Sequence, residues 1–167
     1  MLNMNTFDKN KIFGKCLCKA YSFVENENKI KVERTFKDFF KNLEVKRVKS
    51  TENFLGKCSL NGAQIHVEIN STAFKEMWLS ERLNEKEITI RIIKTLRHEL
   101  RHVLQIFFIY SYVRDVRKMN KIVEKINRSF DYFNNPLEVD ARAHENVPIT
   151  STDCGLVMSR LLNKFHA

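Results

Sequence analysis

The chain has 167 residues, of which 43% are hydrophobic and 29% are charged. This length is enough to bury one hydrophobic core, and the apolar content excludes a wholly disordered chain. The 29 Lys and Arg exceed the 20 Asp and Glu and give a net charge of +9, but they are scattered, and no nucleic-acid recognition motif accompanies them. We therefore predict a single domain over residues 1–167 and do not favour a nucleic-acid partner.

The sequence lacks the segments that direct a chain to or across a membrane. Residues 1–11 have no apolar core of signal-peptide length, and the most apolar run, 103–113, has about half the length that a bilayer requires. No two of the four cysteines have the spacing of zinc knuckles or redox motifs, so we expect reduced thiols. Cys16 and Cys18 would need partners elsewhere in the chain to bind a second metal. We predict a cytoplasmic protein.

Helical spacing dominates the first quarter of the chain. Apolar residues recur there every three or four positions, which predicts one or two amphipathic helices over residues 7–43. The residues that carry this pattern are Val32, Phe36, Phe39, Phe40 and Leu43.

The middle of the chain has the two-residue alternation of a β-strand. In residues 64–70, Ile65, Val67 and Ile69 alternate with polar side chains, which predicts a half-buried strand. Asn61-Gly62 is a favoured hairpin turn, so residues 54–60 should pair antiparallel with that strand. Residues 44–49 are a candidate for a third strand. The sequence thus predicts a small antiparallel sheet.

From residue 84 onward the spacing is helical again. Asn84 and Glu87 have the spacing of an N-cap and its reciprocal partner, and apolar residues continue the pattern to about Tyr112. Further helices are expected over residues 116–130, 136–145 and 152–165. The predicted fold is mainly helical α+β, with the small sheet beside the long helix.

Residues 98–102, inside that long helix, read His-Glu-Leu-Arg-His. Four residues advance a helix by slightly more than one turn, so His98 and His102 share a face and can bind one ion. Glu99 lies at a different angle, close enough to accept a proton from a water on that ion. These side chains would be costly in so apolar a segment without a partner that uses them. We predict a zinc site with His98 and His102 as ligands and Glu99 as general base.

A catalytic zinc ion has a third protein ligand and keeps its fourth position for water. Gln105 and Phe108 stand where a metzincin would have Gly and His, so the third ligand must come from later in the chain. The best candidate is Glu138, in the sequence Pro-Leu-Glu-Val-Asp-Ala of residues 136–141.

With HELRH and PLEVDA, the chain resembles zincin-like metallopeptidases of the Glu-zincin type over residues 60–145. The resemblance implies a minimal zincin fold in which His98, His102 and Glu138 bind zinc and Glu99 is the catalytic base. Many relatives also have Asp or Asn four residues after the glutamate ligand, to orient the first histidine; here that position is Arg142, so Asp140 or another acid would have to take this role.

Alternatives remain for several residues. With Asn135 as N-cap, Glu138 would fall where a carboxylate reaches back to the cap, and Asp140 or His144 would then replace it as ligand. Tyr132 is a candidate for stabilising the oxyanion of a tetrahedral intermediate, as are Tyr110 and His66. By the same resemblance, the strand over residues 64–70 would receive an extended peptide if it lies at a sheet edge; the alternative, which we favour slightly, is that it is simply a strand of the sheet.

These features predict a zinc-dependent metallopeptidase that cleaves a peptide or protein substrate. One alternative is an SprT-like protease acting on nucleoprotein targets, with His144 as third ligand. Another is a non-catalytic basic binding module in which the HELRH face is structural.

Overall fold

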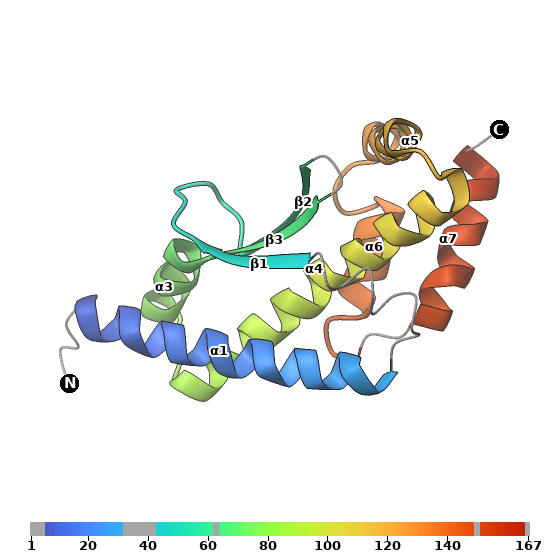
Figure 1. The fold of residues 1–167 in the computed structure, drawn as a ribbon. Helices are drawn as coiled ribbons and strands as arrows, with labels where there is room; N and C mark the ends of the chain where they lie inside the picture. Colours follow the sequence, from blue (N-terminus) through green and yellow to red (C-terminus); the bar gives the residue numbers. More distant parts are fainter. Residues whose placement is uncertain (1–5, 32–42, 62–63, 149–150, 166–167) are drawn as a thin grey trace.

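A computed structural model describes residues 6–31, 43–61, 64–148 and 151–165. In this part of the chain helices predominate and a three-stranded sheet lies beside them (Figure 1), which confirms the predicted mainly helical α+β fold. The elements are α1 (Thr6–Lys31), β1 (Leu43–Val48), β2 (Gly56–Asn61), β3 (Gln64–Asn70), α3 (Ser71–Ser80), α4 (Glu85–Val113), α5 (Val116–Ser129), α6 (Pro136–Ala143) and α7 (Ser151–Phe165).

The sheet has the strand order β1-β3-β2. β2 and β3 pair antiparallel as predicted, with Cys58 opposite Val67. β1 pairs with β3 in parallel, so the sheet is mixed rather than antiparallel throughout. The reason is that residues 49–55 lead the chain from β1 to β2 and leave room for one strand between them. The chain then reverses direction after β2, and β3 fills this space. Residues 64–70 are therefore a central strand, as the alternative to the edge-strand role had it, and the edge position that the resemblance suggested for them is wrong; β2 is the edge strand next to α4.

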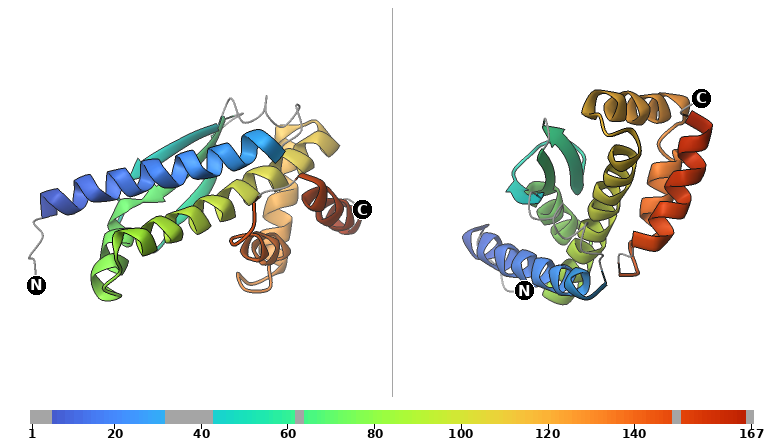
Figure 2. Two further views of the ribbon diagram at one scale, coloured as in Figure 1. Left: turned by 90° about the horizontal axis from the view of Figure 1, so that it is seen from below. Right: turned by 45° about the vertical axis from the view of Figure 1, so that its right-hand side comes forward.

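The long helix α4 is the centre of the fold. It begins with the predicted capping box, in which the Asn84 side chain accepts from the Glu87 backbone and the Glu87 carboxylate accepts from the Asn84 backbone. It contacts α1, β2 and β3, and its C-terminal half is surrounded by α5, α6 and α7. Figure 2 shows α1 and α4 side by side, with α5, α6 and α7 gathered around the C-terminal end of α4. The core side chains of α4 are Ile88, Ile92, Leu96, Leu100, Val103, Leu104 and Ile109.

Two local assignments differ from the sequence-based expectation. Helix α3 was not predicted; it follows β3 without a break because Asn70, the last residue of β3, also caps α3 by accepting from the Thr72 backbone. Leu43 opens β1 rather than ending a helix. The apolar residues Val32, Phe36, Phe39 and Phe40, and the turn residue Gly62, lie outside the described residues.

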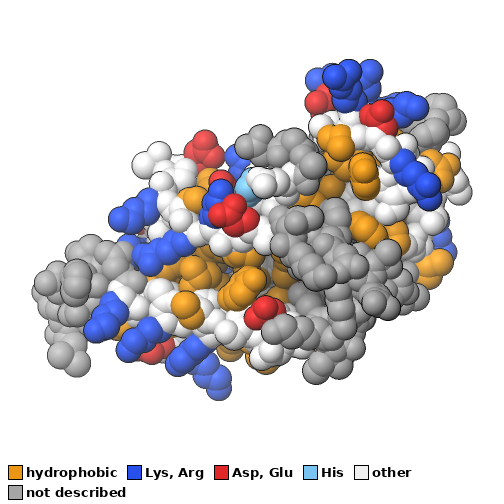
Figure 3. Space-filling view, in the orientation of Figure 1, with side chains coloured by type: hydrophobic (Ala, Val, Ile, Leu, Met, Phe, Trp, Pro, Cys, Tyr) orange, Lys and Arg blue, Asp and Glu red, His pale blue; other side chains and the backbone are white. Residues whose placement is uncertain are grey.

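The described helices, the cysteines and the surface charges agree with a chain that has free thiols and dispersed basic residues. None of the described helices combines the length and the apolar character that a bilayer-spanning segment needs. Cys16, Cys18, Cys58 and Cys154 are free thiols. On the face drawn in Figure 3, Lys and Arg side chains gather over α5 and are otherwise dispersed among acidic and apolar ones.

Candidate metal centre

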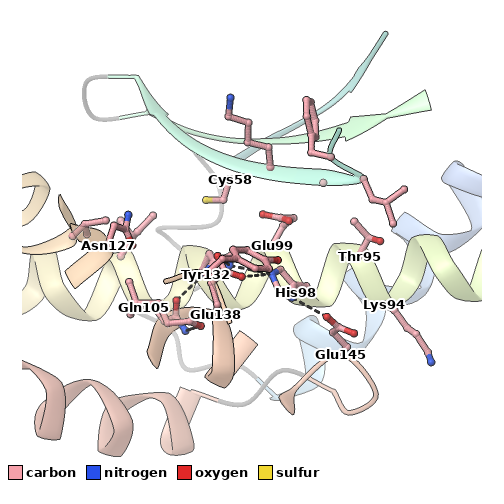
Figure 4. Close-up of a pocket in the computed structure, with 18 of the residues that line it drawn as sticks. Cys58, Lys94, Thr95, His98, Glu99, Gln105, Asn127, Tyr132, Glu138 and Glu145 are labelled. Atoms are coloured by element: carbon pink, nitrogen blue, oxygen red, sulfur yellow. Dashed lines mark hydrogen bonds and ion pairs between the residues drawn. The ribbon is translucent and has the colours of Figure 1, made fainter. Parts of the chain in front are cut away.

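Two imidazoles of α4 and one carboxylate of α6 converge on a single point, and Figure 4 labels His98 and Glu138 there. The Nε2 atoms of His98 and His102 face each other at 3.1 Å. The Glu138 carboxylate bridges them, with Oε2 at 3.3 Å from Nε2 of His98 and Oε1 at 3.3 Å from Nε2 of His102. Among the described residues, these three form the group whose potential ligand atoms all lie within 4.8 Å of one another. The predicted trio is therefore brought together and could hold a metal ion.

Local sequence explains how α6 presents Glu138. The Asn135 side chain caps the helix by accepting from the Leu137 backbone, and Pro136 occupies the first turn, where its missing N–H costs nothing. The Asn135 backbone N–H donates to the carbonyl of Asp131, not to Glu138. The capping alternative for Glu138 is thus not what the structure has, and its carboxylate turns to the imidazoles instead.

The electrostatics of the trio suit a cation. Burial opposes ionisation of Glu138, but the neighbouring His102 and His98 rings outweigh it and hold the pKa of Glu138 well below its usual range. Oε2 of this carboxylate is buried and has no well-aligned hydrogen-bond donor among the described residues, although Nε2 of His98 lies 3.3 Å away. Two imidazole nitrogens and a carboxylate oxygen, with one acceptor atom unsatisfied, are a donor set that zinc enzymes use. The residues present therefore fit a zinc ion.

Glu99 lies beside this centre but points elsewhere, towards β2 (Figure 4). It is buried, and its carboxylate accepts a hydrogen bond from the Cys58 backbone. Burial raises the pKa of Glu99, partly offset by the neighbouring His102 and His98. A carboxylate whose pKa is shifted towards neutrality is suited to accept and return a proton.

Gly56, in β2, is a site residue that the sequence did not reveal. A Cβ atom at this position would lie 2.5 Å from Cγ2 of Thr95 and 2.8 Å from Cγ of Glu99. Only the absence of a side chain lets β2 approach α4 this closely. Nothing in the sequence around Gly56 distinguishes it from a turn glycine, because the contact is between distant segments.

The outer nitrogens of both imidazoles are hydrogen-bonded. Nδ1 of His98 lies 2.9 Å from Oε1 of Glu145, and Nδ1 of His102 lies 2.8 Å from Oε1 of Gln105. Neither partner was predicted. Because each ring is held through its Nδ1 atom, both Nε2 atoms face the centre.

The residues that the sequence offered as alternative ligands or orienting groups have other partners. Asp140 does not orient His98; its carboxylate accepts two hydrogen bonds from Arg101. Nδ1 of His144 lies 2.7 Å from the Asp140 carbonyl, and His144 is not part of the converging trio. Arg142, at the position where relatives have Asp or Asn, donates to the carbonyl of Phe133.

A cleft of about 610 Å³ opens beside the centre, between β2 and the helices α4, α5 and α6. Tyr132, from the segment before α6, lines it, is 59% exposed and forms a hydrogen bond with Glu138. His66 and Tyr110, the other two candidates for an oxyanion donor, are not among the lining residues. Side chains that line the cleft include His98, Glu99, His102, Cys58, Asn127 and Glu138.

Comparisons with models of known protein families, with curated protein sequences and with solved structures gave no match. A functional conclusion therefore depends on the chemistry of the residues around the centre.

Proposed function

We propose that this protein is a zinc-dependent hydrolase, and specifically a metallopeptidase of the zincin type. The observation that carries the proposal is the convergence of His98, His102 and Glu138 at an open cleft, with the buried Glu99 carboxylate next to them. Glu138 is the third ligand in this proposal, because Asp140 is bound to Arg101 and His144 to the Asp140 backbone. The free thiols support the intracellular location that we include in the proposal.

The residues divide the chemistry among them. A zinc ion on His98, His102 and Glu138 would supply Lewis acidity and lower the pKa of a water molecule in the cleft. Glu99 takes the proton from that water as it attacks the peptide carbonyl and then gives it to the leaving amine. In this proposal Tyr132, which lines the cleft, donates a hydrogen bond to the oxyanion of the tetrahedral intermediate.

An extended peptide is the substrate shape that suits the cleft. Gly56, Lys57 and Cys58 of β2 line it, and in the described part of the chain β2 pairs with β3 alone. The other edge of β2 therefore offers backbone groups to a peptide that adds to the sheet as a further strand. The resemblance suggested this role for residues 64–70, and we assign it to β2 because β2 is the edge strand.

Metal analysis and peptide cleavage test the proposal together. The purified protein should contain one zinc ion per chain, and His102→Ala should lose it because a two-ligand site binds zinc weakly. A proteome-derived peptide library analysed by mass spectrometry should show cleavage by the wild type. Glu99→Gln should keep the zinc and lose about 10²- to 10⁴-fold in rate, since the base is removed but the ligands stay.

Glu76→Gln, on the exposed face of α3, is the matched control and should change neither zinc content nor rate. A wild-type protein without stoichiometric zinc, or Glu99→Gln cleaving as fast as wild type, would contradict the proposal.

A further inference from the structure

Gln105 lies one turn beyond His102 on α4, is 1% exposed and forms three hydrogen bonds. Its Oε1 lies 2.8 Å from Nδ1 of His102. Its Nε2 donates to Oδ2 of Asp140 at 2.7 Å and to the Leu137 carbonyl at 3.0 Å. One amide thus connects a proposed zinc ligand to two groups of α6.

The chemistry of these partners permits only one orientation of the amide. The Leu137 carbonyl and the Asp140 carboxylate are acceptors, so the NH₂ group of Gln105 must face them. The carbonyl oxygen of Gln105 then faces His102, and a ring nitrogen beside a carbonyl oxygen must carry the proton. His102 therefore has a proton on Nδ1, and Nε2, which faces His98 and Glu138, is the nitrogen left to bind a metal ion.

Arg101 fixes the carboxylate on which this orientation depends. It is 0% exposed, and its Nε and Nη2 atoms donate to the two oxygens of Asp140 at 2.8 and 3.0 Å. This two-point contact leaves the Asp140 carboxylate no freedom to rotate. Arg101 lies within the HELRH sequence itself, so the same helical turn carries a proposed ligand and the anchor of its orienting network.

We propose that Gln105, held by Asp140 and Arg101, is a positioning residue that sets the tautomer of His102 for metal binding. The inference rests on the proposed zinc site and names the residues that prepare it. His98 differs, because its partner is the carboxylate of Glu145, which accepts from Nδ1 whichever way it turns. An amide can present either NH₂ or oxygen to an imidazole, which explains why the His102 side has an additional buried anchor.

The test is made first on the metal-free protein, by ¹⁵N NMR of the imidazole rings. The wild type should show His102 protonated on Nδ1. Gln105→Met, similar in size, leaves the Arg101–Asp140 pair intact and should give a mixture of tautomers. Its zinc affinity, measured by competition with a chelator, should fall about 10- to 100-fold. Gln64→Met, at an exposed position of β3, is the matched control.

Asp140→Asn gives a second test, at the anchor of Gln105. Oδ2 of Asp140 accepts from both Nε of Arg101 and Nε2 of Gln105, and Oδ1 accepts from Nη2 of Arg101, so either orientation of the new amide sets an NH₂ group against a donor of Arg101. The anchor of Gln105 is therefore loosened, and the expected result is a mixture of His102 tautomers with zinc affinity below that of the wild type. If this variant does not fold, Gln105→Met decides alone. An unchanged tautomer and unchanged affinity in Gln105→Met would overturn the inference. If the wild type shows the expected tautomer of His102 but binds no zinc, the positioning role of Gln105 is supported and the proposed function is contradicted.

Discussion

Oε1 of Glu145 lies 2.9 Å from Nδ1 of His98, although the two residues belong to different segments and 46 residues separate them. The backbone carbonyl of Glu145 accepts a hydrogen bond from Arg97, which is also ion-paired with Glu27 of α1. The orientation of one imidazole therefore depends on α1, on α4 and on the residues that follow α6.

Replacing Glu145 should weaken zinc binding without removing a ligand. Glu145→Ala leaves Nδ1 of His98 without its acceptor, so we expect about 10- to 100-fold lower zinc affinity in a chelator competition assay. Glu145→Gln should lose less, because an amide oxygen still accepts but its orientation is not fixed. Glu76→Ala, a glutamate exposed on α3, should bind zinc as the wild type does. Equal affinity for Glu145→Ala and wild type would show that Glu145 has no orienting role.

The parts of the site that the sequence predicted are those set by local geometry. His98, Glu99 and His102 are placed by the turn of one helix, and Glu138 by the Asn135-Pro136 start of another. Glu145 and Gln105 were not predicted, because their contacts with the imidazoles depend on the packing of α6 against α4 and on side-chain orientation.

The same division holds for the fold. The capping box at Asn84 and the β2–β3 pairing follow from residues close in the sequence, and both were predicted. The position of β3 between two strands depends on where residues 49–55 cross, which periodicity does not encode. Helix α3 was not predicted because Asn70 both ends β3 and caps α3, so no Gly or Pro marks the boundary.

Tyr132→Phe should reduce turnover while zinc content stays the same. The hydroxyl is the group that reaches Glu138 at the cleft, and loss of one donor to an oxyanion costs about 10²- to 10³-fold in kcat. KM should change little, because the donor acts mainly in the transition state. Tyr110→Phe removes a hydroxyl that does not line the cleft and should have wild-type kinetics. A wild-type kcat for Tyr132→Phe would exclude the oxyanion role.

Gly56→Ala should separate β2 from α4. The added methyl would meet Thr95 and Glu99 at distances below van der Waals contact, and overpacking of this kind costs about 1–3 kcal/mol. Thermal unfolding should show the loss of stability, and cleavage should slow because the Cys58 backbone moves away from Glu99. The double variant Gly56→Ala/Thr95→Ala relieves the closest contact and should recover part of both losses. No recovery would mean that the strain lies elsewhere.

The stabilisation that zinc confers should increase with pH. In the metal-free centre the neighbouring carboxylates favour a protonated His98, whereas zinc binds only neutral imidazoles. In the metal-free protein, burial lowers the pKa of His98, but Glu138, Glu99 and Glu145 outweigh it and raise the pKa above 6.5. The stability from this group is therefore complete below pH 6.5 and is lost as the pH rises through the folded-state pKa. The lowered pKa of Glu138 acts in the opposite sense: its contribution is present above pH 4.5 and is lost as the pH falls through the folded-state pKa.

Zinc competes with protons for both imidazoles, so it should bind weakly near about pH 5.5 and tightly near about pH 7.5. At a free zinc concentration of about 100 times Kd, the gain is about 2.7 kcal/mol. For a chain of this size that corresponds to an increase of roughly 5–11 °C in Tm. Melting curves with zinc and with chelator at the two pH values measure the difference directly. Glu138→Gln should reduce the increase at the higher pH, and an equal zinc effect at both pH values would mean that these imidazoles do not bind the metal.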